Sequence, residues 1–232
     1  MSAIVFENDT PKTVTESVYR RLRTDILWGR LPPEMPLKSD ALRSRYQVGI
    51  SPLREALSRL ASEKLVVASG QKGFRVAPLG EDSICDISYT RLVIESAALT
   101  KSIKVGDVDW ETRIVASHHS LSRVPIPKSP GEEVEMWTRH HRVFHMALIS
   151  ACGSLWQMHF AGLLFDQAER FRIIRAKELS FYEDERNPAE EHQEILESVL
   201  DRDAPVALRA LERHYKATMK IALAALGKFH NA

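Results

Sequence analysis

The stretch VGISPLREALSRLASEKLV (48–66) decides the fold of the first part of the chain. Ser51 is a suitable N-cap, Pro52 suits the first helical position, and Glu55 completes an approximate capping arrangement. The apolar residues that follow recur at helical spacing, at Leu53, Ala56, Leu57 and Leu60. The pattern predicts an amphipathic helix with one buried apolar face and one outward polar face.

The segments on either side of this helix complete a small domain. Before it, the sequence predicts an amphipathic helix at 14–28, a turn-rich connector at 29–36 and a short helix at about 39–46. After it, LVVASGQKGFRVAPL (65–79) is typical of strand, turn and strand. Three helices and a β-hairpin wing form a winged helix-turn-helix, which we place at 13–77. Its third helix can enter a DNA major groove, and the hairpin can reach the neighbouring backbone.

Beyond Pro78 the strand signal disappears, and each segment shows helical periodicity. Asn187 followed by Pro188 is a helix cap and first-turn pair. The six predicted helices cover 81–104, 108–122, 132–151, 154–177, 188–201 and 204–225. We therefore expect an all-α six-helix bundle at 82–226 and a mainly α fold class.

The small net charge is the sum of a basic first part of the chain and an acidic second part. The chain carries 32 Lys and Arg against 31 Asp and Glu, which taken as one number argues against a nucleic-acid partner. Residues 1–77 carry 13 basic against 8 acidic residues, a net of +5, and the remainder carries 19 against 23, a net of −4. A basic first part is suited to phosphate, although a solvated basic face has the same composition.

Other features of the sequence exclude whole classes of protein. Two cysteines in 232 residues rule out a disulfide scaffold, and we expect Cys85 and Cys152 to be small buried residues. The opening MSAIVFENDT is mixed and acidic, unlike a signal peptide. No apolar run approaches the ~18 residues that a membrane span needs. We expect a cytoplasmic protein with no membrane partner.

Three motifs of the first domain resemble the DNA-binding domain of GntR-family bacterial transcription regulators. They are GRLPPEMPL (29–37), SPLREALSRL (51–60) and the wing QKGFRV (71–76). The resemblance implies that the domain binds double-stranded DNA. It leaves the operator sequence open, because Ile50 and Asp40 stand where many members carry basic residues.

The helical remainder resembles the FCD effector domain of the FadR-type branch, in its six-helix, VanR-like form. The motifs are FHMAL (144–148) followed by ISACGS (149–154), then EHQEIL (191–196) and RHY (213–215). The likeness covers residues 13–225 in the correct order. The sequences of these motifs are most similar to those of repressors of glutarate and lysine-type catabolism.

The outward positions of the third helix supply the predicted DNA contacts, at Ser51, Arg54, Ser58 and Arg59. By the resemblance Arg54 reads a base, and a bidentate Arg to guanine contributes ~1–3 kcal/mol of discrimination. The alternative is a surface Arg paired with Glu55 or Asp40. The resemblance also assigns a DNA contact to Lys72 at the hairpin tip. Phosphate contacts are expected at Arg43 and Arg45.

Histidines form the candidate metal site. His141 and His145 are four residues apart, so they lie on one helix face, as two ligands of one ion or as ordinary core residues. The resemblance adds His192 and His214, which match the later metal positions of the family. Nitrogen ligands favour Zn²⁺, with Ni²⁺ as an alternative. The family usually has Asp where His141 stands, so we expect an uncompensated metal charge that attracts an anion.

Arg91 is the candidate effector-binding residue, on the predicted buried face of the first bundle helix. Either it pairs with Glu95 one turn later, or it faces the metal cavity and binds a carboxylate. Arg170 and Arg172 are further candidates for the same role.

We predict a homodimeric repressor that binds a near-palindromic operator and is released by a small carboxylate bound beside the metal. One alternative is a regulator for which the metal itself is the signal. A less favoured alternative is a metal-dependent hydrolase, since three His ligands with an open position can activate water. We expect no enzyme, because the sequence has no base placed by a motif such as HExxH.

Overall fold

The computed structural model describes residues 11–69, 73–126, 132–178 and 186–230. The chain divides into two compact units, Met1–Pro78 and Leu79–Ala232. Each unit has an apolar core of its own. The fold is mainly α, as predicted.

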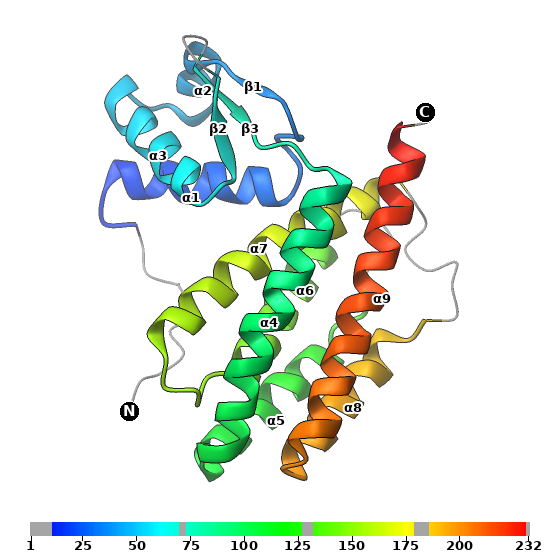
Figure 1. Ribbon diagram of the computed structural model, residues 1–232. Coiled ribbons are helices and arrows are strands. Elements are labelled where there is room, and N and C mark those ends of the chain that lie inside the picture. The colour runs from blue at the N-terminus through cyan, green and yellow to red at the C-terminus, as the bar shows by residue number, and fades with distance from the viewer. Residues whose placement is uncertain (1–10, 70–72, 127–131, 179–185, 231–232) are drawn as a thin grey trace. The chain divides into compact units, whose positions relative to one another are not determined.

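The part of the first unit that the structure describes contains three helices and a small sheet (Figure 1). The elements are α1 (Val14–Leu27), β1 (Pro36–Leu37), α2 (Ser39–Tyr46), α3 (Ile50–Ser62), β2 (Val66–Ala68) and β3 (Phe74–Val76). The sheet has the order β1-β3-β2 and is antiparallel throughout. This is a winged helix-turn-helix.

The predicted hairpin is confirmed by the antiparallel pairing of β2 with β3. Two details of this unit differ from the prediction. The end of the predicted connector adds a third strand, β1, with Pro36 opposite Arg75. Proline is tolerated in such a short edge strand because no N–H has to be donated there. The N-cap of α3 is Gly49, and no side chain caps this helix. Ser51 therefore lies inside the first turn.

The core of the first unit is formed by the apolar faces of its helices. α1 packs against α3, and β2 closes the same core. The predicted apolar stripe of α3 is fully buried, at Leu53, Ala56, Leu57 and Leu60. Burial of a Leu side chain contributes about 1.5–3 kcal/mol, so this stripe fixes α3 in the fold.

The described part of the second unit contains six helices (Figure 1). They are α4 (Glu81–Val105), α5 (Val108–Ser122), α6 (Glu132–Leu148), α7 (Leu155–Glu178), α8 (Pro188–Leu200) and α9 (Ala204–His230). α4 packs against α7 and α9, α5 packs against α6, and α8 packs against α9. The side chain of Asn187 accepts a hydrogen bond from the N–H of Ala189, which confirms the predicted cap of α8.

The core of the second unit is centred on large aromatic side chains. Trp110 is fully buried, and its indole N–H donates a hydrogen bond of 3.0 Å to the carbonyl of Ala147. Gly106 lets this ring approach the end of α4, because a Cβ there would lie 2.2 Å from the ring. Cys152 is buried, as predicted, but Cys85 is exposed. The prediction for Cys85 was wrong because it lies on an outward position of α4.

Among the described helices, none combines the length and the apolar character needed to cross a membrane.

Candidate functional site

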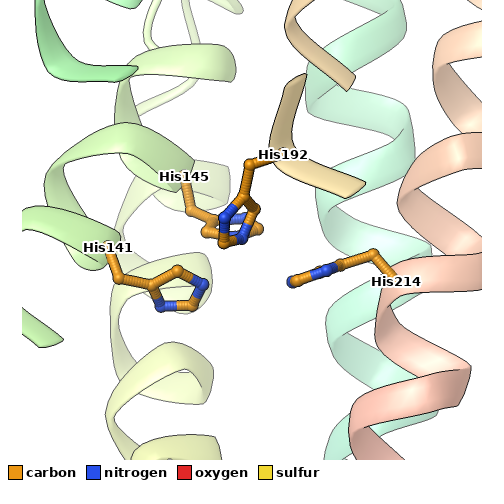
Figure 2. A group of neighbouring side chains, drawn as sticks. All are labelled: His141, His145, His192 and His214. Carbon is orange, nitrogen blue, oxygen red and sulfur yellow. The ribbon is translucent and has the colours of Figure 1, made fainter. Parts of the chain in front are cut away.

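Four histidines converge in the interior of the second unit (Figure 2). His141 and His145 come from α6, His192 from α8 and His214 from α9. All four are buried, and one ring nitrogen from each lies within 4.8 Å of the others. We call this group the four-histidine cluster. The structure thus brings together all four residues that the sequence singled out.

The helices explain why these rings meet. The spacing of four residues places His141 and His145 on one side of α6, where their rings meet edge to face with centroids 4.4 Å apart. The Trp137 ring, one turn before, is stacked on His141 at 4.5 Å and an interplanar angle of 15°. α8 and α9 pack against each other and bring His192 and His214 to a centroid distance of 4.7 Å.

The donor set fits a transition metal. Neutral imidazole is a ligand for Zn²⁺, Ni²⁺ and Cu²⁺, whereas Ca²⁺ and Mg²⁺ prefer oxygen. Four nitrogen donors from three helices match the four positions of a tetrahedral ion. The cluster could therefore hold a metal ion.

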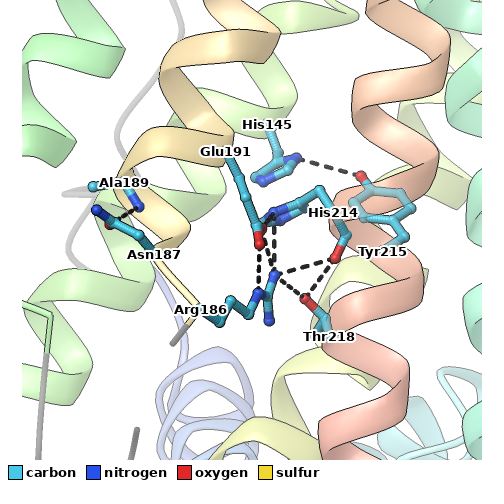
Figure 3. A network of polar contacts seen from close by, with 8 residues as sticks. All are labelled: His145, Arg186, Asn187, Ala189, Glu191, His214, Tyr215 and Thr218. Atoms are coloured by element: carbon cyan, nitrogen blue, oxygen red, sulfur yellow. Dashed lines mark hydrogen bonds and ion pairs between the residues drawn. The ribbon is translucent and has the colours of Figure 1, made fainter. Parts of the chain in front are cut away.

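A second layer of polar residues surrounds His214 (Figure 3). Its Nδ1 lies 2.7 Å from Glu191 Oε2, and Arg186 donates to both carboxylate oxygens of Glu191, at 2.7 and 2.6 Å. Arg186 also donates to the carbonyl of His214 and to the hydroxyl of Thr218. Burial acts to raise the pKa of Glu191, but the hydrogen bonds from Arg186 and His214 outweigh it and lower this pKa to about 2.

Carboxylates also approach the other side of the cluster. Glu169 on α7 is buried, and its Oε1 lies 3.7 Å from His141 Nδ1. The Tyr215 hydroxyl donates to Glu95 and lies 3.3 Å from His145 Nδ1. The expectation of an uncompensated metal charge stays a prediction, because Glu95 and Glu191, two of the acids near the imidazoles, are themselves paired with Arg91 and Arg186. Long-range packing, which the sequence does not show, places these acids near the imidazoles.

Arg91 pairs with Glu95, which is the first of the two roles that the sequence left open. Its Nε donates to Glu95 at 2.5 Å, and its guanidinium lies 4.3 Å from the ring centroid of Tyr215 and 4.7 Å from that of Phe165. The side chain is buried, and within the described ranges its Nη2 has no hydrogen-bond partner. Burial acts to lower the pKa of Arg91, but Glu95 outweighs it and raises this pKa, so the side chain remains a cation. Tyr215 connects it to the four-histidine cluster.

The two other candidate arginines differ. Arg170 is buried and donates to Gln167, and burial lowers its pKa to about 10. The side chain of Arg172 lies outside the described residues.

In the first unit, the predicted DNA contacts are in different environments. Ser51 and Arg54 are exposed in the first turns of α3. Arg59 is directed toward α1, where it donates to Glu16 at 2.7 Å and lies 3.7 Å from the Tyr19 ring centroid. Arg59 is thus on the polar face, as expected, but engaged within its own unit.

The remaining predicted DNA contacts lie on α2 and in the wing. Arg43 is 3.5 Å from Asp40, and Arg45 donates to Asp25 at 2.7 Å. Lys72 lies outside the described residues. Next to it the N–H of Ser69 donates to the carbonyl of Gly73 at 2.7 Å.

Sequence reasoning missed four residues around the cluster: Glu169, Arg186, Glu191 and Tyr215. Glu191 and Tyr215 each adjoin a predicted metal ligand in the motifs EHQEIL and RHY, which was a usable signal. No comparable signal marks Glu169 or Arg186, because tertiary contacts alone bring them to the imidazoles.

Comparisons with known proteins agree with this architecture. Residues 14–76 match the family described as bacterial regulatory proteins, gntR family, and residues 86–217 match the FCD domain. The chain is 37% identical over 212 residues to the HTH-type transcriptional regulator BphR of Paraburkholderia xenovorans, covering 90% of this chain and 85% of that one. It is 34% identical over 200 residues to the HTH-type transcriptional repressor GlaR of Escherichia coli, covering 84% and 90%.

The fold is also similar to that of a solved structure. This is a putative transcriptional regulator GntR from Rhodococcus sp. RHA1, with a TM-score of 0.72 and 18% identity over 90% of this chain and 97% of that one. At this identity, the likeness concerns the fold alone.

Proposed function

The chain belongs to the GntR family of bacterial regulatory proteins and carries an FCD domain, and from this premise we propose that it is a ligand-released repressor. The family consists of DNA-binding transcription regulators, not enzymes. In our proposal a divalent metal, Zn²⁺ or alternatively Ni²⁺, is held by the four-histidine cluster. A small carboxylate that binds beside it weakens operator binding. The relative GlaR, which is named a repressor, supports the sign of this response.

One observation carries the proposal: the four-histidine cluster and the buried Arg91 share one interior. A metal ion there supplies positive charge that favours an anionic ligand. Arg91 supplies a planar cation whose Nη2 is not engaged by any described residue. A guanidinium fork suits a carboxylate. The apolar rings of Phe165 and Tyr215 beside it exclude water, which strengthens such a contact.

The resemblance to repressors of glutarate-type catabolism makes a short dicarboxylate the first effector to test. Its binding changes repression only if it prefers one of two conformations of the protein. A coupling of ~1–3 kcal/mol is the usual scale, equal to a 5–150-fold change in operator affinity.

DNA recognition is proposed for α3 and its neighbours. Arg54 reads a base edge from the exposed start of α3, and Ser51 lies beside it. Lys72 contacts the DNA backbone from the wing. Phosphate contacts come from Arg43, Arg45 and Arg59. A homodimer places two copies of α3 in successive major grooves of a near-palindromic operator, with half-sites ~34–36 Å apart.

The test is fluorescence anisotropy with labelled DNA from upstream of the protein's own gene. The Zn²⁺-loaded protein is expected to bind at low salt and to lose 5–150-fold in affinity when glutarate or another short carboxylate is added. The double variant Arg91→Met/Glu95→Gln removes the cation without leaving a buried carboxylate unpaired, and it should abolish the response while leaving operator binding intact. No binding at low salt by the folded protein would contradict the regulator. A full response in this double variant would contradict the effector site.

A second candidate function treats the metal as the signal. Four nitrogen donors complete a tetrahedral set, and closed sets are typical of structural metal sites. Operator affinity with chelator, with Zn²⁺, and with Zn²⁺ plus carboxylate separates the two. A change on adding Zn²⁺ alone, with no further change from any carboxylate, favours metal sensing.

A further inference from the structure

Arg186 and Glu191 form a bridge between the segment that precedes α8 and the middle of α9 (Figure 3). The arginine donates from Nε to Glu191 Oε1 at 2.7 Å and from Nη2 to Oε2 at 2.6 Å, a two-point contact that fixes the plane of the carboxylate. The same Nη2 reaches the carbonyl of His214 at 3.2 Å and the hydroxyl of Thr218 at 3.0 Å. We call this pair the Arg186–Glu191 clamp.

The clamp lies against one of the two ring nitrogens of His214, Nδ1. Glu191 Oε2 lies 2.7 Å from Nδ1, and an ionised carboxylate can only accept a hydrogen bond, so Nδ1 must be the donor. The contact of 3.3 Å between Arg186 Nη2 and the same Nδ1 is longer, and Nη2 has better acceptors in three oxygens. A protonated Nδ1 leaves the lone pair of a neutral imidazole on Nε2. In this tautomer Nε2 is the nitrogen that can bind a metal.

We propose that Arg186 and Glu191 are positioning residues for the metal site, holding His214 as the Nδ1–H tautomer with its Nε2 presented to the other three imidazoles. This inference rests on the proposed metal site. A ligand histidine whose second nitrogen donates to a carboxylate has a fixed ring orientation and a more basic ligand nitrogen. Arg186 acts through Glu191, because its two hydrogen bonds hold the carboxylate in plane.

The chain contains a matched control. Arg213 and Glu194 form another ion pair between α9 and α8, one residue from His214 along the chain, but exposed to solvent. It joins α9 to α8 with the same residue types, and within the described part of the chain neither side chain forms a hydrogen bond or ion pair with an imidazole. It controls for the loss of an Arg–Glu contact next to these helices, so a change of tautomer seen at Glu191 and not at Glu194 reports on His214.

The first measurement is the tautomer of His214 in the metal-free protein, read from long-range ¹H–¹⁵N spectra of the ¹⁵N-histidine-labelled full chain. In the wild type we expect the proton on Nδ1. In Glu191→Gln the preference should be lost, because an amide can donate or accept. In Glu194→Gln it should be unchanged. A wild-type spectrum with the proton on Nε2 overturns the proposal without any variant.

The second measurement is a Zn²⁺ titration in competition with a chromophoric chelator. Glu191→Gln should bind Zn²⁺ tenfold to a hundredfold more weakly than wild type. Arg186→Gln should weaken Zn²⁺ binding by a smaller factor, and Arg186→Lys should weaken it less than Arg186→Gln does. Glu194→Gln and Arg213→Gln should stay within about twofold, in line with the small effects of surface pairs. Equal affinities in Glu191→Gln and Glu194→Gln overturn the clamp. If the wild type binds no Zn²⁺, the proposed metal site fails, while the tautomer still tests the clamp.

Discussion

The two units of this protein differ in how many polar and charged side chains they bury. Among the buried polar side chains of the described residues, only Asp25 lies in the first unit, whose core is otherwise formed by apolar residues such as Leu57. The second unit buries four histidines together with Arg91, Glu95 and Glu169. Removing charges from water costs free energy unless they are paired. If the proposed function is right, the first interior serves stability and the second serves binding.

The largest effect is expected from breaking a buried ion pair of the second unit. Arg91→Met leaves Glu95 without its counter-charge, and we expect a loss of about 3–5 kcal/mol in the free energy of unfolding. The double variant Arg91→Met/Glu95→Gln should recover most of this, because the amide still accepts from Tyr215. Urea unfolding followed by tryptophan fluorescence measures both.

The matched control for Arg91 is Arg139→Gln. Arg139 forms an i,i+4 pair with Glu135 on α6, and its side chain is 65% exposed. The loss there should be at most about 0.5 kcal/mol. If Arg91→Met and Arg139→Gln lowered the free energy of unfolding equally, burial of the Arg91–Glu95 pair would have no special effect on stability.

The next effect concerns the apolar core of the first unit. Leu57 is fully buried on α3, so Leu57→Ala should cost about 2–5 kcal/mol through lost burial and the cavity left behind. Operator binding should be lost at the temperature where this unit unfolds, whereas Zn²⁺ binding by the second unit should persist. Calorimetry with and without Zn²⁺ measures this, with the exposed neighbour changed in Ser58→Ala as the control. Simultaneous loss of both activities would show that the units do not unfold separately.

A smaller effect is expected on the DNA-binding surface. Arg54→Ala should weaken operator binding by ~1–3 kcal/mol and relax the preference for one base. Arg59→Ala should have a smaller effect, because Arg59 is already engaged with Glu16 and Tyr19. Anisotropy titrations at fixed salt against wild-type and single-base-variant operators separate the two. A larger loss of operator affinity in Arg59→Ala than in Arg54→Ala would contradict the assignment of base reading to Arg54.

The smallest effect is the pH dependence of Asp25, the one buried acid among the residues described in the first unit. Burial acts to raise the pKa of Asp25, but hydrogen bonds from Tyr46 and Arg30 and the charge of Arg45 outweigh it and lower this pKa below the usual 3.8. A lowered pKa in the folded state means that the stabilisation is complete above about pH 5 and is lost as the pH falls through that pKa. The difference of about 1 kcal/mol between wild type and Asp25→Asn should therefore shrink below about pH 4. If the stability difference between wild type and Asp25→Asn grew as the pH fell, the pKa of Asp25 would be raised in the folded state, and the prediction would be wrong.

Much of this architecture could be predicted from the sequence. The periodicity of apolar residues placed α4 and α5 to within a residue, since a helix that packs on one side must repeat its apolar positions. The strand β1 was missed because its Pro36 and Leu37 follow a Pro-rich turn and carry no alternating pattern. The N-cap of α3 was misplaced because Ser51 and Pro52 satisfy the usual preferences although Gly49 takes the position.

The residues of the candidate site were likewise predictable only in part. The four histidines were found because their spacing and the family motifs agreed. Their surroundings, Glu169 and Arg186, could not be predicted, because they depend on how α7 and the segment before α8 pack against α6 and α9. Local sequence predicts the ligands of such a centre more readily than the residues that orient them.

The central claim is that the polar interior of the second unit is a metal site made of imidazoles. Zn K-edge X-ray absorption of the Zn²⁺-loaded full chain tests it most directly. The account predicts a shell of four nitrogens at ~2.0–2.1 Å with the multiple scattering of imidazole, reduced in His145→Ala. A shell of oxygens, or a spectrum that His145→Ala leaves unchanged, would contradict it.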